Sequence, residues 1–245
     1  MNRILLESDE VDSSGRIVLC GQRARHINKV LHAKCGDILR IGLLDGPRGE
    51  GRVIAIEPDC VEIYGDFEGE LPPAPQISLL LALPRPKVMR RLWAPLASLG
   101  VRRIILTNAE KVERNYFATH WLEEMVYRPL LIEGLQQSGD TRLPEVTIIK
   151  KFKPFIQDQI CAEFEGVRKL LLHPRQAQPL GDIKLKSDRE VLLAIGPEGG
   201  WSDYEVDLLA QYGFECVMHG WRVLRTDVAC IAAIAAVNLL QDRKQ

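Results

Sequence analysis

The sequence has no strong excess of either charge and no long hydrophobic segment. Its 32 Lys and Arg residues stand against 33 Asp and Glu, a formal net charge of -1, which excludes a uniformly basic protein that coats nucleic acid. The longest apolar run, near residues 228–237, is shorter than the roughly 20 residues needed to cross a bilayer. With 46% hydrophobic residues, the composition indicates an ordinary globular protein without a membrane span.

The six cysteines are scattered, with no CxxC pair and no Cys/His cluster at the spacing of metal ligands, so we expect no metal site. Charged residues interrupt the first twenty positions, which therefore lack the apolar core of a signal peptide. The thiols then suggest a reducing compartment, and the predicted localisation is cytoplasmic.

A proline-rich stretch, Pro72, Pro73 and Pro75, divides the chain into two predicted domains. Residues 1–72 contain short segments of alternating apolar and polar residues separated by turn signals, a pattern typical of a small antiparallel β-barrel. Residues 73–245 alternate strands and helices. Continuous apolar runs such as residues 191–195 predict a parallel sheet covered by helices on both faces, so the fold class is α/β with an N-terminal barrel.

Basic residues are concentrated in two segments, although the net charge of the whole chain is close to zero. Residues 14–56 carry eight Lys or Arg against three acids, and residues 84–114 carry eight against two, whereas residues 57–70 carry six acids and no base. The two basic segments either form one surface that neutralises phosphates or are ordinary solvated faces.

The stretch LLAIGPEGGWSDYE, residues 192–205, is the most informative one. A buried strand leads into a loop with three glycines, and Ser202 and Glu205 then form a capping box that opens a helix, for which Gly213 is a plausible stop. Strand, glycine loop and helix N-terminus place backbone donors at the carboxyl edge of a sheet, where open α/β proteins bind ligands. A plain turn is the alternative interpretation.

The stretch HGWRVLRTDVA, residues 219–229, places Arg222 and Arg225 three positions apart, ahead of Thr226 and Asp227 at the start of the last helix. That helix is rich in alanine, so it can approach another helix closely. A dimer face and packing inside the monomer are both compatible with this pattern.

Together these two stretches resemble the signature of SPOUT-class RNA methyltransferases, specifically the RsmE family, whose usual form is GPEGGFSxxE followed by LGxRILRxETA. The stretches at residues 26–37, 108–117, 135–146 and 170–174 resemble further family segments, so the resemblance covers nearly the whole chain. One departure concerns Asp140, because many members read QSGR where this chain has QSGD and the nearest arginine is Arg142. The region between Tyr116 and Gln136 is longer than in many family members, and Pro129 is expected to kink or split its helix.

The resemblance implies an N-terminal PUA-like, RNA-binding barrel and a C-terminal α/β domain tied in a trefoil knot, an exception to the rule against knots. It also implies a homodimer that methylates a uridine of small-subunit (16S) ribosomal RNA at its N(3) imino nitrogen, using S-adenosylmethionine bound in the knot. Transferred residue by residue, the cofactor-binding set comprises Leu172, His173, Gly196, Pro197, Glu198, Gly199, Gly200, Met218, His219, Gly220, Val223, Leu224 and Arg225.

The chemistry calls for removal of the imino proton or for stabilisation of charge on the flanking carbonyls. Arginine suits the second task, so Arg225 is the first candidate, followed by Arg222 and Arg142, one of which could instead hold a phosphate. Glu198 is the leading proton acceptor, although a structural role in its loop is an equal alternative.

RNA contacts are expected from basic residues of both segments, because the target base has to be splayed out while the backbone is held. This predicted set comprises Arg23, Arg25, Lys29, Arg85, Lys87, Arg90, Arg91 and Arg114. Two other functions are compatible with the sequence. One is a non-catalytic RNA-binding factor that retains the fold, and the other is an enzyme that uses the glycine loop to bind a nucleotide or phosphate.

Overall fold

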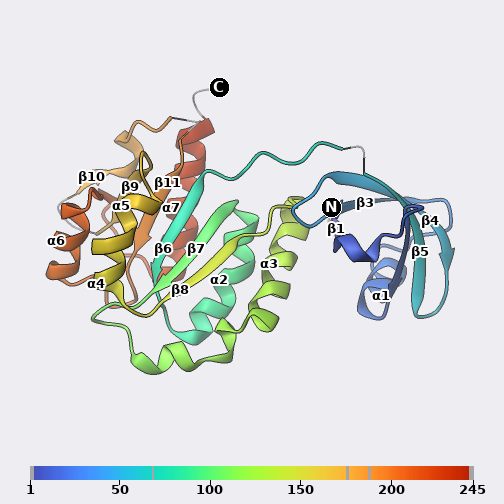
Figure 1. The fold of residues 1–245 in the computed structure, drawn as a ribbon, viewed down its shortest axis with the longest axis horizontal. Helices are drawn as coiled ribbons and strands as arrows, with labels where there is room; N and C mark the ends of the chain where they lie inside the picture. Colours follow the sequence, from blue (N-terminus) through green and yellow to red (C-terminus); the bar gives the residue numbers. More distant parts are fainter. Residues whose placement is uncertain (1–2, 68, 175–176, 187–188, 243–245) are drawn as a thin grey trace. The chain divides into compact units, whose positions relative to one another are not determined.

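The computed structural model describes residues 3–67, 69–174, 177–186 and 189–242. The chain forms two compact units: a barrel unit, Met1–Ala74 with Leu135–Leu143, and an α/β unit, Pro75–Gly134 with Pro144–Gln245. The return of residues 135–143 to the barrel unit is a feature that the sequence analysis did not anticipate. Each unit has its own sheet (Figure 1). No helix within the described ranges is long and apolar enough to cross a membrane.

The barrel unit contains a curled five-stranded sheet with the strand order β1-β3-β4-β5-β2 (Figure 1). Side chains in β2 alternate between exposed and buried, which produces the hydrophobic core on one face of the sheet. The pairing is antiparallel as expected, except that β1 runs parallel to β3, with Ile4 opposite Ile41. The elements are β1 (Ile4–Leu6), β2 (Arg16–Cys20), α1 (Gln22–Lys29), β3 (Ile38–Leu43), β4 (Arg48–Ile56) and β5 (Cys60–Asp66).

A disulfide joins Cys20 to Cys60, which lie opposite each other on β2 and β5 with a Cα–Cα distance of 4.2 Å. The prediction that all six cysteines are thiols is therefore wrong for this pair. Their spacing gave no sign of this pair, since 40 positions separate two residues that only the strand pairing brings together.

The returning segment completes the barrel unit through hydrogen bonds. The backbone N–H of Arg3 donates to the Gln136 carbonyl (3.0 Å), and the backbone N–H of Asp45 donates to the Thr141 carbonyl (2.8 Å). Thr141 is fully buried, and its hydroxyl donates to the carbonyl of Gly46 at 2.7 Å. These contacts make residues 135–143 part of the barrel unit, although the rest of that unit is far from them in the sequence.

The α/β unit is built on a seven-stranded sheet with the order β10-β12-β9-β11-β6-β7-β8, in which every pair is parallel. All residues of β6 and β11 are buried, as the continuous apolar runs predicted. Because the strands are parallel, their carboxyl ends lie at one edge. The strands are β6 (Ile77–Ala82), β7 (Val101–Thr107), β8 (Glu145–Ile149), β9 (Arg168–Leu172), β10 (Gln178–Pro179), β11 (Val191–Ile195) and β12 (Glu215–Met218).

Helices cover this sheet. Helix α2 (Pro86–Ser98) packs against α7 (Thr226–Asp242); α2 contacts β7, and α7 contacts β6 and β11, so the two share one face. Helix α6 (Asp203–Gln211) lies with α4 (Phe152–Pro154) and α5 (Ile160–Glu163) beside β9 and β10 (Figure 1). Helix α3 (Glu124–Ser138) runs through Pro129 without interruption, so Pro129 does not split it, and a kink there stays a prediction.

The helical segment 152–163 is divided into α4 (Phe152–Pro154), a π-helical turn (Phe155–Gln159) and α5 (Ile160–Glu163). The π-helical turn is a deviation that a simple 3.6-residue period does not reveal.

Candidate functional site

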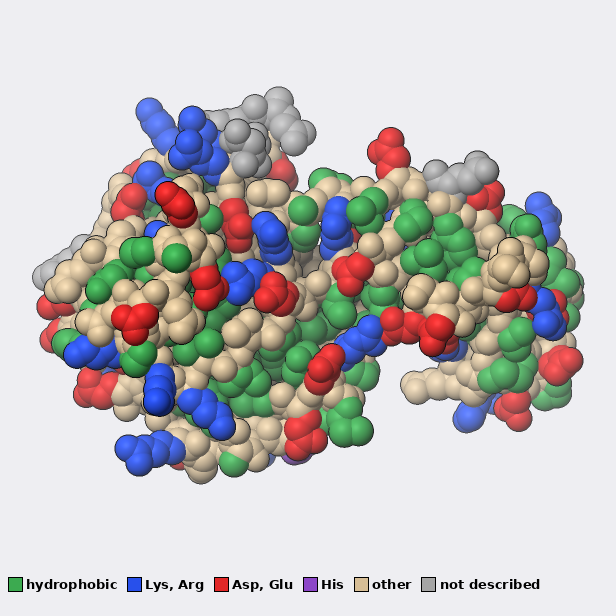
Figure 2. Space-filling model, viewed as in Figure 1, with side chains coloured by type: hydrophobic (Ala, Val, Ile, Leu, Met, Phe, Trp, Pro, Cys, Tyr) green, Lys and Arg blue, Asp and Glu red, His purple; other side chains and the backbone are tan. Residues whose placement is uncertain are grey.

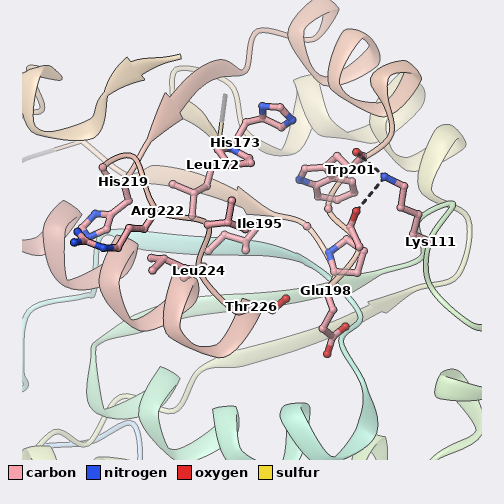
Figure 3. Close-up of a pocket in the computed structure, with 18 of the residues that line it drawn as sticks. Lys111, Leu172, His173, Ile195, Glu198, Trp201, His219, Arg222, Leu224 and Thr226 are labelled. Atoms are coloured by element: carbon pink, nitrogen blue, oxygen red, sulfur yellow. Dashed lines mark hydrogen bonds between the residues drawn. The ribbon is translucent and has the colours of Figure 1, made fainter. Parts of the chain in front are cut away.

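A cavity of about 480 Å³ opens at the carboxyl ends of β9 and β11 in the α/β unit (Figure 3). Segments that follow four strands, the start of α6 and the first turns of α7 line it. Most of the expected cofactor-binding set is brought together here, whereas Met218 and Arg225 are not among the lining residues. The expected residues that line the cavity are Leu172, His173, Gly196, Pro197, Glu198, Gly199, Gly200, His219, Gly220, Val223 and Leu224.

Glycines shape the loop that follows β11. A Cβ atom on Gly196 would lie 3.0 Å from the backbone nitrogen of Trp201, so a side chain there would displace backbone. Gly200 and Gly220 each have a φ of +68°, a conformation that costs other residues free energy. The loops therefore present their backbone N–H and C=O groups to the cavity at close range.

The predicted capping box is confirmed, because the Glu205 carboxylate accepts hydrogen bonds from the backbone N–H (2.8 Å) and hydroxyl (3.1 Å) of Ser202. Its other oxygen accepts from the backbone N–H of Glu110 at 2.8 Å. Glu205 is only 4% exposed, so this buried carboxylate joins the start of α6 to the segment that follows β7.

Lys111 lines the cavity, although the sequence placed it only in a basic segment. Its ammonium group donates to the carbonyl oxygens of Gly199 (3.0 Å) and Trp201 (3.4 Å), as the dashed lines in Figure 3 mark. No local pattern signals this role, because 88 positions separate Lys111 from Gly199.

Glu198 also connects segments at this edge of the sheet. Its Oε1 accepts a hydrogen bond from the backbone N–H of Arg85 at 3.0 Å, just after β6. This contact is the one expected of a residue that fixes its loop.

The two arginines before α7 have different surroundings. Arg222 lines the cavity, and its guanidinium lies 4.1 Å from the centre of the Trp221 ring. The Arg225 side chain is 71% exposed and forms an ion pair with Asp227 at 3.2 Å. Asp227 also pairs with Arg91 on α2 at 2.9 Å, so one carboxylate on α7 holds two guanidinium groups.

Arg142 lies in the barrel unit, where its Nε donates to the carbonyl of Pro72 at 2.9 Å. Asp140 accepts from the backbone N–H groups of Thr141 (2.6 Å) and Arg142 (3.1 Å). Asp140 thus caps the turn at the position where the family pattern has an arginine.

Cys230 lies in the α7 turn that follows Thr226. Burial, followed by the charge of Asp227, raises the pKa of the Cys230 thiol to about 12. The thiol is therefore neutral at physiological pH and is neither a base nor a nucleophile for this cavity.

The basic side chains differ in their exposure and in whether an acid pairs with them. Of the expected RNA contacts, Arg25, Lys29, Arg85, Lys87, Arg90, Arg91 and Arg114 are exposed, whereas Arg23 is partly buried and pairs with Glu10. Arg102 and Arg103 lie at the amino end of β7, opposite to the cavity, and both pair with acids. Figure 2 likewise shows acidic and basic side chains side by side over the face in view.

Trp201 is a second residue that the sequence analysis missed. It is 4% exposed, it lines the cavity, and its ring stacks on Phe152 with a centroid distance of 5.4 Å. Its indole nitrogen is buried without a hydrogen-bond partner among the described residues.

Known proteins resemble this chain in both sequence and structure. The model of the RNA methyltransferase domain family matches residues 72–238. The ribosomal RNA small subunit methyltransferase E of Treponema pallidum is 32% identical over 97% of this chain and 90% of its own length. A Borreliella burgdorferi protein, ribosomal RNA small subunit methyltransferase E 1, is 30% identical over 95% of both chains. Among solved structures, the ribosomal RNA small subunit methyltransferase E of Neisseria gonorrhoeae bound to S-adenosyl methionine has a TM-score of 0.77 and 26% identity, covering 98% of both chains.

Proposed function

Because the chain belongs to the ribosomal RNA small subunit methyltransferase E family, we propose that it transfers a methyl group from S-adenosylmethionine to the N(3) imino nitrogen of a specific uridine in 16S ribosomal RNA. The observation that carries the proposal is the cavity at the carboxyl ends of β9 and β11, which is lined mainly by the two stretches that bear the family signature. The proposed compartment is the cytoplasm, because ribosomes are assembled there.

The lining residues fit this cofactor. A volume of about 480 Å³ lies within the usual range for small-molecule sites. Gly196 and Gly200 leave backbone donors and acceptors open to the polar groups of a nucleoside and an amino acid. Leu172, Ile195 and Leu224 provide apolar contacts for a base, and the carboxylates of Glu198 and Asp203 suit a cationic ligand.

When bound, the cofactor supplies an electrophilic methyl group. The neutral imino nitrogen of uracil is a poor nucleophile, so the protein has to favour its deprotonated form. In our proposal, Arg225 and Arg222 stabilise the negative charge on the uracil carbonyls, because a guanidinium is always charged and carries a fork of donors. Asp227 positions Arg225 through their ion pair.

Glu198 and Arg142 are the remaining candidates. Glu198 acts first as the residue that holds its loop on the Arg85 backbone, and proton acceptance is its second proposed role. Arg142, whose Nε is engaged by the Pro72 carbonyl, is proposed to hold a phosphate of the RNA.

RNA recognition is proposed to use exposed cations of both units, with the target base turned out of its stack. We also propose that the protein is a homodimer and that the segments around the cavity are tied in a trefoil knot. On α7, the exposed side chains of Val228, Ile231 and Leu239 lie on one helical face and suit contact with a second copy. Light scattering coupled to size exclusion measures that state directly.

The deciding experiment is a methyl-transfer assay with labelled S-adenosylmethionine on small ribosomal subunits that lack the modification, followed by nucleoside analysis of the RNA. We expect 3-methyluridine. Methylation of another atom or RNA would refute the specificity proposed here. Cofactor binding without transfer to subunits or free RNA would identify a non-catalytic RNA-binding factor instead.

A further inference from the structure

The outer face of the barrel sheet carries an exposed row of side chains that crosses β3, β4 and β5, which are neighbouring strands (Figure 1). Arg52 on β4 lies opposite Ile38 on β3 and opposite Tyr64 on β5, so the three side chains project from one face. The exposed fraction is 48% for Ile38 and 54% for Tyr64, whereas Leu39 and Ile63, which follow or precede them in the chain, are buried in the core. Large apolar side chains left exposed in a row mark a candidate contact surface.

The ring of Tyr64 is held against the turn that precedes β2. A Cβ built on Gly15 would lie 3.5 Å from Cε2 and Cζ of Tyr64, so the ring packs beside the backbone of that turn. Gly15 has a φ of +86°, a conformation that favours glycine, and its missing side chain leaves room for the ring. The ring is therefore both fixed and accessible. Aromatic rings placed in this way stack on nucleobases of any sequence, because every base has a π-face.

A second feature of the outer face is a cavity of about 360 Å³ in the next rows of the sheet. Its row contains Arg40 and Asp66, which follow Ile38 and Tyr64 by two positions on the same strands and flank Glu50. Two residues along a strand span about 7 Å, a length comparable to one nucleotide. We call this the arginine cavity, and its lining residues are Arg3, Arg40, Arg48, Gly49, Glu50, Asp66 and Gly69.

The three arginines of this cavity carry charges that no ion pair within the described ranges neutralises. Arg3 donates hydrogen bonds only to backbone carbonyls, those of Ile41 and Gly49. Burial, followed by the charges of Arg48 and Arg40, lowers the pKa of Arg3 below its ordinary value. The guanidinium groups therefore repel one another, and a bound anion would offset the repulsion. Guanidinium groups match the geometry of phosphate oxygens in particular.

We propose that the outer face of the barrel sheet binds single-stranded RNA, with Tyr64 stacked on a base and the three arginines of the cavity bound to an adjacent phosphate. Glu50 and Asp66 in the same cavity favour a ligand that also donates hydrogen bonds, as the 2′-hydroxyl groups of RNA do. The inference rests on the proposed function, because the RNA held here is the one that is methylated. It adds a stacking residue and a phosphate site that the RNA-contact set expected from the sequence does not contain.

Fluorescence anisotropy of the full-length protein with a labelled oligouridylate of about twelve nucleotides tests the stacking. For Tyr64→Thr, which keeps a residue suited to a strand, we expect Kd to rise about tenfold. Tyr64→Phe keeps the ring and is expected to bind like the wild type. The matched control is Tyr204→Thr on α6, where the side chain is equally exposed at 54% and Kd is expected to stay unchanged.

A salt series with the same oligouridylate tests the phosphate site. Arg48→Gln should reduce the slope of log K against log salt by about 0.7, the contribution of one phosphate of a single strand. Arg168→Gln is the control, because Arg168 is exposed and pairs with Glu215 at 2.6 Å in the other unit, and its slope should equal that of the wild type. The wild type should bind oligodeoxyuridylate of the same length more weakly. Equal affinity for the two would overturn the assignment of RNA as the ligand.

A wild type that binds the RNA, together with an unchanged Kd for Tyr64→Thr and an unchanged slope for Arg48→Gln, would overturn the inference and leave the proposed function standing. Failure of the proposed function is a separate result, the absence of 3-methyluridine from subunits treated with the wild type. If Tyr64→Thr keeps its RNA affinity but is monomeric by light scattering where the wild type is dimeric, the face contacts a second copy and the inference is wrong. All variants are expected to bind S-adenosylhomocysteine like the wild type, which verifies their folding, because the cofactor cavity lies in the α/β unit.

Discussion

The ammonium group of Lys111 lies 3.0 Å from the carbonyl oxygen of Gly199 and donates a hydrogen bond to it. The glycine loop after β11 is thus held by a residue from the segment after β7. The stem of Lys111 also fills the space beside Gly199, since a Cβ there would lie 2.9 Å from Lys111 Cδ. The conformation of the cavity wall therefore depends on a contact between loops whose strands, β7 and β11, are not neighbours in the sheet.

Replacing Lys111 by Met should weaken cofactor binding. The Met side chain keeps much of the stem but removes two hydrogen bonds to the loop, so we expect Kd for S-adenosylhomocysteine to rise by about three- to tenfold. Isothermal titration measures this. Lys150→Met, at an exposed position outside the cavity, is the control. Equal Kd values for both variants would show that the loop holds its conformation without Lys111.

The Gly200→Ala variant should lose stability through its backbone alone. No atom lies within 4 Å of an added Cβ, but the φ of +68° costs an L-residue about 1–2 kcal/mol. Gly181→Ala is the matched control, because its Cβ also meets nothing within 4 Å and its φ is not positive. Urea denaturation should therefore separate the two variants, and a loss as large in Gly181→Ala would contradict the explanation.

The Arg225→Ala variant is expected to bind S-adenosylhomocysteine normally and to lose turnover by about a hundredfold, the effect of removing one charged stabiliser. Arg222→Ala should also raise Kd for the cofactor, because Arg222 lines the cavity and Arg225 does not. Single-turnover kinetics and titration measure the two effects separately. Full turnover by Arg225→Ala would remove that residue from the mechanism.

Exposed cations of the proposed RNA surface should contribute to the salt dependence of binding. The changes Lys87→Gln and Arg114→Gln are each expected to reduce the slope of log K against log salt by about 0.7–0.9 for every phosphate that the variant no longer neutralises. Arg102→Gln is the control, since Arg102 pairs with Glu190 at the opposite end of β7. Filter binding over a salt series provides the slopes, and unchanged slopes would take both residues out of the surface.

Stability at acid pH should depend on the ion pair between Glu10 and Arg23. The hydrogen bond from Arg23 is the main cause that lowers the pKa of Glu10 below its ordinary value of 4.5. Because the folded-state pKa is the lower one, the stabilisation is complete above about pH 4.5 and is lost as the pH falls through the folded-state pKa. Urea denaturation between neutral pH and about pH 3 should show a flatter acid limb for Glu10→Gln. Glu165→Gln, at an exposed position without an ion pair in the described ranges, should follow the wild type.

Local sequence patterns predicted the elements that carry the cavity. The apolar runs of β6 and β11, the capping box of Ser202 and Glu205, and the positive φ at Gly213 all depend on residues close together in the chain, and each is present. The parallel β1–β3 pair, the Cys20–Cys60 disulfide and the return of residues 135–143 were missed, because each joins segments that no local pattern connects.

The cavity likewise combines features that the local sequence predicts with features that only the tertiary structure shows. The sequence alone indicated two of the segments that form it, since GPEGG and the stretch from His219 to Arg225 carry turn and cap signals and the family resemblance. Only the tertiary structure decided that Lys111 and Arg85 hold those loops, that Asp227 binds both Arg91 and Arg225, and that the Trp201 indole is left without a partner among the described residues. The reason is physical: the partner of a hydrogen bond or an ion pair is set by distance in space, and the order of strands in a parallel sheet brings together residues that the chain keeps far apart.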